Sequence, residues 1–165
     1  MTWTLLGIGR QEPASIEREM PPEFTDETAQ AWFGPDKNLH RRLWALDADQ
    51  AAAAVGMLNM FDQSVPAEGM DYWLTHGTSW VVEAYNESDD ELAFTFHLPP
   101  SFGFADAARW TGTWSIDVFG GEFPLEAQPL EELSKTFGVN VDTDRYAYFL
   151  AARSSAPTTG AEDTP

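Results

Sequence analysis

Three residues near the middle of the chain, Glu83, His97 and Asp117, are the set best suited to acid–base chemistry. A histidine held near a carboxylate can serve as a general base. Each of the three lies in a segment where aromatic and β-branched residues are dense and residue character alternates, a pattern typical of strands. These segments are 79–86, 91–98 and 113–119. If the three strands share a sheet, the three side chains point to one face and form a candidate catalytic site.

The same face would carry hydroxyl groups that could contact a ligand. Tyr85 and Thr95 alternate in phase with Glu83 and His97, and Ser115 alternates in phase with Asp117. We therefore take Tyr85 and Thr95 as candidate binding residues in a pocket or a barrel lumen. The alternative is a face open to solvent, because antiparallel sheets often have one wetted side.

The other face of the same strands is apolar and predicts their pairing. In the segment 91–98 this face consists of alternate residues, namely Leu92, Phe94, Phe96 and Leu98. The polar stretch 87–90 suits a hairpin turn between the first two strands. A shift of one residue in the pairing would place Glu83 opposite Phe94, which the rules of strand register disfavour. We expect the two apolar faces to lie together in the core.

Motifs for cofactors and metals are absent from the sequence. Gly7-Ile8-Gly9 matches the start of a dinucleotide-binding fingerprint, but a third glycine at the required spacing and a following helix pattern are missing. No phosphate-binding loop or nucleophile elbow is present. The three histidines, His40, His76 and His97, have no spacing that suggests a metal site. We predict no cofactor and no metal.

The charge is the strongest signal in the composition. The chain has 27 acidic and 9 basic residues, which gives a formal net charge of −18. Such a surface repels nucleic acid and anionic membranes at long range, and it accelerates encounter with a basic protein. We therefore predict no direct nucleic-acid binding, no membrane binding and a basic protein partner. The same charge is also compatible with solubility or adaptation to a salty cytoplasm, and with mimicry of DNA phosphates.

Length and composition indicate one folded domain. The chain has 165 residues, of which 43% are hydrophobic, and this is enough for a sizeable core. We assign residues 1–153 to a single domain and predict that the small, polar stretch 154–165 is a disordered tail. The sequence contains no apolar run long enough for a membrane span and no signal-peptide pattern. With no cysteine for disulfides, a cytoplasmic location is the expectation.

Helices and further strands are expected on both sides of the central segments. Asp47 and Gln50 form a capping box at the start of a helix over 47–61, which contains four consecutive alanines. Two more helices are predicted over 25–33 and 129–137 from their caps. The remaining expected strands are 2–9, 39–46, 70–74 and 145–153, and the segments 10–24 and 101–110 are expected to be loops.

Aromatic residues outside the central strands are further candidates for binding. Trp32 and Phe33 at the end of the first helix would form a partner contact if they are exposed, or core packing if they are not. The expected loop 101–110 carries Phe102, Phe104 and Trp110, which could form a lid over the sheet or plug the end of the core. A tyrosine-rich last strand at a sheet edge could pair with a second copy of the chain and give a homodimer.

Together these features predict an α+β fold. We expect a twisted, mainly antiparallel sheet of four to six strands with two or three helices on one face. The first functional hypothesis is a non-enzymatic acidic protein of bacterial or archaeal type, which acts as an inhibitor, immunity-type or chaperone-like partner of a basic protein. The alternatives are a small enzyme or ligand-binding sheet that uses the face with Glu83, His97 and Asp117, and a DNA-mimic inhibitor.

Overall fold

The structure is a computed structural model that describes residues 2–11, 13–35, 43–58 and 69–154. In chain order its elements are β1 (Trp3–Gly9), β2 (Ser15–Glu19), α1 (Asp26–Phe33), β3 (Leu43–Ala45), α2 (Ala48–Met57), β4 (Met70–His76), β5 (Thr78–Asn86), β6 (Leu92–His97), α3 (Phe104–Thr111), the 3₁₀ helix η1 (Ile116–Phe119), β7 (Glu122–Pro124), α4 (Ala127–Phe137) and β8 (Tyr146–Ser154). None of the helices in these ranges has the length and hydropathy needed to span a membrane.

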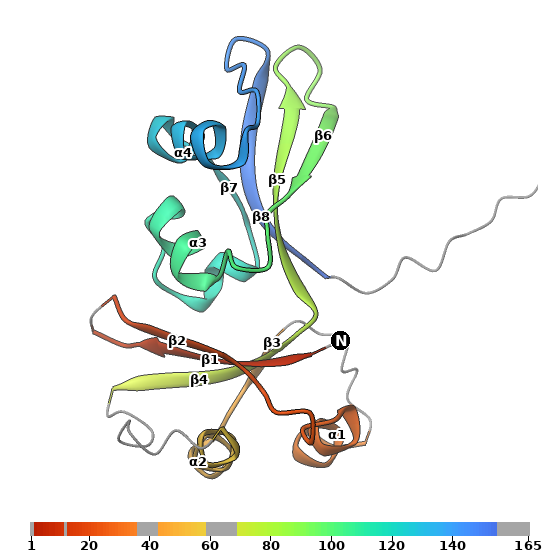
Figure 1. Ribbon diagram of the computed structural model, residues 1–165, viewed down its shortest axis with the longest axis vertical. Coiled ribbons are helices and arrows are strands. Elements are labelled where there is room, and N and C mark those ends of the chain that lie inside the picture. Colours follow the sequence, from red (N-terminus) through yellow and green to blue (C-terminus); the bar gives the residue numbers. More distant parts are fainter. Residues whose placement is uncertain (1, 12, 36–42, 59–68, 155–165) are drawn as a thin grey trace, which may run out of the picture.

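The strands form two antiparallel sheets, so the fold is α+β, but the expectation of one sheet is wrong. Sheet A has the order β2-β1-β4-β3, and sheet B has the order β6-β5-β8-β7. Strands β4 and β5 follow each other directly through Gly77, whose φ of 56° lies in the left-handed region that favours glycine. This residue turns the chain from one sheet into the other (Figure 1). The alternating pattern of 70–86 does not reveal that change of sheet.

Helices α1 and α2 cover one face of sheet A, beneath the sheet in Figure 1. Strands β1 and β4 turn Trp3, Leu5 and Leu74 to this face, where they form a core with Ala51 and Val55 of α2. Both helices begin where the sequence indicates. Thr25 caps α1, and the predicted capping box of Asp47 and Gln50 is present at the start of α2. The predicted extension of α2 to 59–61 lies outside the described residues.

A second, larger core joins sheet A to sheet B. Leu6 and Ile8 on the opposite face of β1 belong to the same cluster as Trp80 and Val82 of β5 and Phe104 of α3. Helices α3 and α4 lie on one side of sheet B and close this cluster (Figure 1). Sheet A is therefore packed on both faces, which explains the nearly continuous burial of β1.

Three segments differ from their expected structure. The stretch 10–24 contains strand β2, a polar edge strand in which Leu6 pairs with Glu17 and Thr4 with Glu19. The expected loop 101–110 contains helix α3. The expected strand 113–119 contains η1, because the Ser115 hydroxyl accepts a hydrogen bond from the backbone N–H of Asp117 (3.2 Å) and closes a turn. Serine side chains commonly compete with a strand ladder in this way.

Strand β8 lies in the interior of sheet B between β5 and β7. The expectation that this last strand forms a sheet edge is therefore wrong, and the described edges of sheet B are β6 and β7. Tyr148 and Leu150 of β8 are buried in the second core, with exposures of 3% and 0%. A homodimer through an edge strand stays a prediction, but β8 is not available for it. Ser154 belongs to β8, and the rest of the predicted tail lies outside the described residues.

Candidate functional site: the outer face of sheet B

The face of sheet B that points away from α3 and α4 carries the predicted polar residues. We call it the outer face. The strand register places Glu83 opposite Thr95 and Val81 opposite His97 on β6, as the pairing of apolar faces predicts. On the other side, Glu83 pairs with Phe149 of β8. The outer face consists of Val81, Glu83, Tyr85, Thr95, His97, Phe149, Ala151 and Arg153.

A network of charged groups lies at the centre of the outer face. The Arg153 Nε donates to Glu83 Oε1 (2.8 Å), and the second nitrogen of the guanidinium lies 2.6 Å from Glu122 Oε1. The Tyr85 hydroxyl donates to Glu83 Oε2 (3.1 Å). The Glu83 side chain is only 8% exposed, whereas that of Arg153 is 35% exposed. The network therefore pairs a buried carboxylate with an arginine that also contacts Glu122.

The network changes the titration of its members. Hydrogen bonding to Glu83 raises the pKa of Arg153 further above its ordinary value, so the guanidinium stays charged. Desolvation, followed by the hydrogen bond to Glu83, raises the pKa of Tyr85. The phenol is therefore a stable hydrogen-bond donor at neutral pH. The arrangement fixes side chains and holds protons in place.

The predicted catalytic constellation is not assembled. Glu83 and His97 share the outer face, but Asp117 lies in η1 and accepts a hydrogen bond from the Ser115 hydroxyl (2.9 Å). The premise that placed Asp117 and Ser115 on this sheet was a third strand, and that strand does not form. His97 is exposed, as is Thr95. The charge partner of Glu83 is Arg153, which the sequence alone did not identify because the pairing of β5 with β8 spans about 70 residues.

A β-bulge adds an apolar side chain to the outer face. The register of β6 against β5 shifts after the pair Ala84–Phe94, so that Tyr85 lies opposite Leu92. Leu92 was expected to share the inner face with Phe94, and this expectation is wrong because the bulge reverses its direction. Leu92 is 51% exposed. The register places it opposite Tyr85, whose ring packs edge-on against Phe149 at 5.6 Å.

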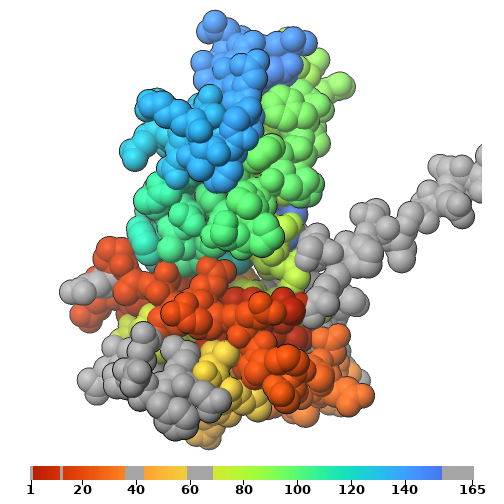
Figure 2. Space-filling view, in the orientation of Figure 1, coloured from red at the N-terminus to blue at the C-terminus, as the bar shows by residue number. Residues whose placement is uncertain are grey.

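Six exposed carboxylates gather at the end of sheet B that is farthest from sheet A. They come from the β5–β6 turn and from the turn that precedes β8, and a hydrogen bond from the Glu87 N–H to the Arg145 carbonyl oxygen (3.0 Å) joins the two turns. Both turns lie at the upper end of the molecule in Figures 1 and 2. We call this group the acidic tip; its members are Glu87, Asp89, Asp90, Glu91, Asp142 and Asp144. Within the described residues, none of the six forms an ion pair.

The other predicted binding residues lie in the two cores. Trp32 and Phe33 are half-buried against the first core, where Phe33 stacks on Trp44 at 4.6 Å. Phe102, Phe104 and Trp110 are at most 6% exposed and belong to the second core. The choice between lid and core is thus decided for this segment by the packing of α3. These aromatic residues therefore contribute buried apolar area to the cores, which is the commoner role of such side chains.

The described residues contain no group of three or more His, Asp or Glu side chains arranged to hold a metal ion. Comparison of the chain with protein-family models, with curated proteins and with solved structures gives no significant match.

Proposed function

We propose that this chain is a non-enzymatic binding protein that docks a basic protein on the outer face of sheet B, next to the acidic tip. The observation that carries the proposal is the position of an exposed apolar group beside six carboxylates without ion-pair partners in the described structure. Such a surface offers an apolar contact and a charge complement to the same partner. An inhibitor, an immunity-type protein or a chaperone-like protein would use it in the same way.

The apolar part of the surface supports protein contact. Leu92 and Tyr85 face each other across the β5–β6 pair, and Phe149 packs against Tyr85 from the adjacent strand. Aromatic residues and arginine near the middle of an interface commonly supply much of its binding energy. In the described part of the chain no helix covers this face, whereas α3 and α4 cover the opposite one (Figure 1). The contact surface is thus formed without any rearrangement of the fold.

The charged part of the surface supports a basic partner. Four of the described cations are already paired with carboxylates: Arg10, Arg109, Lys135 and Arg153. Arg145, the cation within the acidic tip, lies over the ring of Tyr146 at 5.1 Å. The tip therefore presents net negative charge, which speeds encounter with a positively charged surface and adds affinity at low salt.

Photo-crosslinking from the surface tests the proposal. Leu92 is replaced with a benzophenone amino acid in the full chain, which is irradiated in lysate at low salt. Trp114, which is 37% exposed outside the outer face, carries the same probe as the matched control. We expect a basic protein to crosslink to position 92 and not to position 114. Its affinity is then measured with purified proteins.

The purified pair gives the decisive measurement. Asp90→Asn with Glu91→Gln removes two charges of the tip, and Glu27→Gln with Asp49→Asn removes two charges from α1 and α2. We expect the tip variant to weaken binding by about 5- to 10-fold at low salt, and the difference to vanish at high salt because the charges are then screened. The control variant should change affinity by less than about 2-fold. Equal effects of the two variants, or crosslinks that are the same at both positions, would overturn the proposal.

A further inference from the structure

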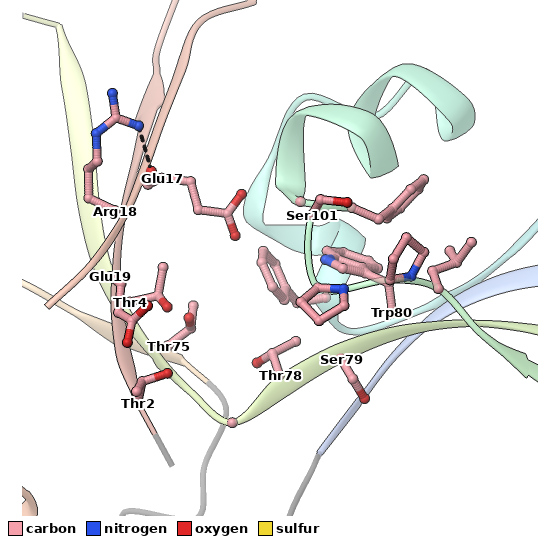
Figure 3. Close-up of a pocket in the computed structure, with 17 residues that line it drawn as sticks. Thr2, Thr4, Glu17, Arg18, Glu19, Thr75, Thr78, Ser79, Trp80 and Ser101 are labelled. Carbon is pink, nitrogen blue, oxygen red and sulfur yellow. Dashed lines mark hydrogen bonds between the residues drawn. The ribbon is translucent and has the colours of Figure 1, made fainter. Parts of the chain in front are cut away.

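A cleft of about 610 Å³ opens between sheet A and the segment that leads from β6 to α3. Figure 3 shows the strands of sheet A on one side and the wall around Trp80 on the other. The floor is formed by Thr78 and Ser79, where β5 leaves Gly77. The volume lies within the range of about 300–1,000 Å³ that small-molecule sites occupy. The cleft shares no residue with the outer face of sheet B.

Strand register lines one wall of the cleft with polar side chains. Thr4 of β1 pairs with Glu19 of β2 and with Thr75 of β4, so these three side chains form a row across the sheet. Glu17 precedes Glu19 by two residues and therefore points to the same side. All four line the cleft. The wall thus presents two carboxylates and two hydroxyl groups.

The cation closest to these carboxylates in sequence does not neutralise them. Arg18 lies between Glu17 and Glu19, and alternation along the strand turns its side chain the other way. Its guanidinium donates to the backbone oxygen of Glu17 (2.8 Å) and extends away from the cleft in Figure 3. No other lysine, arginine or histidine lines the described cleft. The interior is therefore negative.

The Glu17 carboxylate contacts the N-terminus of helix α3. One of its oxygens, Oε2, accepts the backbone N–H of Phe104 (2.8 Å). Glu17 as a whole residue is exposed along the cleft. The pKa of its carboxyl group is nevertheless raised: desolvation and the charge of Asp106 raise it, and these effects outweigh the Phe104 hydrogen bond, which lowers it. Oε1 has no hydrogen-bond partner in the described structure. A cation at Oε1 would replace the lost hydration of this carboxylate.

The opposite wall and the floor of the cleft indicate the rest of the ligand that would carry the cationic group. Trp80, Leu98 and Phe102 form an apolar wall, and Ser101 adds a hydroxyl at its edge. At the floor, Thr78 has a buried hydroxyl oxygen without a hydrogen-bond partner in the described part of the chain. An apolar body with a donor at one end matches both walls.

From this geometry we infer that the cleft binds a small organic cation: an ammonium group that contacts Glu17 and Glu19, carried on an apolar body that packs against Trp80 and Phe102. Carboxylates form the strongest hydrogen bonds with charged donors, and the hydroxyls of Thr4 and Thr75 accept the remaining N–H groups. An anionic ligand would meet two like charges here. A neutral ligand would leave the Glu17 carboxylate without a counter-charge.

The test compares amines with alcohols of the same shape. Phenethylamine and 1,5-diaminopentane are titrated into the full chain at 150 mM NaCl, beside 2-phenylethanol and 1,5-pentanediol. Binding is measured by calorimetry and by NMR shifts of the Thr4, Thr75 and Thr78 methyl groups. We expect at least one amine to bind at least 10-fold more tightly than its alcohol and to shift these methyl signals. Failure of both amines to bind, or equal binding of amine and alcohol, overturns the inference.

Variants separate the site from general attraction to an acidic protein. Glu17→Gln keeps an oxygen that can accept the Phe104 N–H but removes the charge. We expect it to weaken amine binding at least 10-fold, with a similar loss for Glu19→Gln. Glu27→Gln removes a carboxylate from α1, which covers the opposite face of sheet A, and should change affinity by less than 2-fold. Equal losses for Glu17→Gln and Glu27→Gln would show non-specific counter-ion binding and overturn the inference.

Discussion

The contact between Glu17 and the start of helix α3 links the two halves of the protein, and the substitution Gly103→Ala tests it. A Cβ at position 103 would collide with Oε2 of Glu17 and would lie 3.2 Å from its Cδ. The φ of Gly103 is −110°, so the backbone itself accepts an alanine. The flexible Glu17 side chain would therefore move away, and the Phe104 N–H would lose its acceptor.

The expected cost follows from that single lost hydrogen bond. A helix cap contributes about 0.5–2 kcal/mol, and a hydrogen bond to a charged group about 1.5–3 kcal/mol. Because Glu17 is exposed along the cleft, we expect a loss near the lower values, about 1–2 kcal/mol. Replacing glycine with alanine also restricts the unfolded chain and weakens the cap, and these two effects of about 0.5–1 kcal/mol have opposite signs.

A double-mutant cycle isolates the contact. In the Glu17→Ala background the new methyl group meets no carboxylate, so Gly103→Ala should change the free energy of unfolding by less than about 0.5 kcal/mol. The coupling between the two positions should then be about 1–2 kcal/mol. Urea unfolding at pH 7, followed by tryptophan fluorescence and by far-ultraviolet circular dichroism, measures all four proteins. Additive effects within about 0.3 kcal/mol would refute the reasoning, and two separate transitions would show that the halves unfold independently.

Four further outcomes are expected. Arg153→Met should destabilise more than Glu83→Gln, by about 3–5 against 1–3 kcal/mol in urea unfolding, because it leaves a carboxylate that is only 8% exposed without its cation, whereas Arg153 keeps Glu122; the reverse order would contradict the network. Phe104→Ala should cost about 3–5 kcal/mol by the same assay, since Phe104 is 0% exposed and stacks on Phe119, and a loss below about 1 kcal/mol would mean that this core is not close-packed. The pKa of Glu17 is raised in the folded protein, so the folded state binds the Glu17 proton more tightly than the unfolded chain does. The contribution of Glu17 to stability therefore falls as pH rises from about 4.5 through the folded-state pKa. Glu17→Gln should gain stability relative to the unmodified chain across that window, and a difference in unfolding free energy that does not change with pH would contradict this. Raising NaCl from 10 to 500 mM should increase Tm by a few degrees, because salt screens the mutual repulsion of a chain with net charge −18, and a constant or falling Tm in scanning calorimetry would contradict this.

Local signals in the sequence predicted local structure well. The capping box of Asp47 and Gln50 places α2, and Thr25 places α1, because a helix start depends on residues three apart in the chain. The polar phase of Glu83, Thr95 and His97 is correct, because alternation along a strand is local too. These parts of the fold follow from residues that are neighbours in sequence.

Contacts between distant residues account for the errors. Helix α3 begins at a glycine with no side-chain cap of its own, and its first turn is satisfied by Glu17, 87 residues away in the chain. Arg153 reaches Glu83 over 70 residues, so the composition of the outer face could not be read from the strands 79–86 and 91–98 alone. The sequence separates the strands 70–74 and 79–86, but it does not show that the chain passes at Gly77 from one sheet into another.

The order of the two sheets along the chain has a consequence for synthesis on the ribosome. Every strand of sheet A lies within residues 3–76, and every strand of sheet B lies within residues 78–154. Because chains emerge from the N-terminus, sheet A can pair completely before β5 to β8 have emerged from the ribosome. Until α3 emerges, however, Leu6 and Ile8 lack most of the core that buries them. The nascent protein thus carries an apolar sheet face for the time needed to synthesise about 35 residues, a few seconds at ordinary rates, and this is the stage at which a chaperone would recognise it.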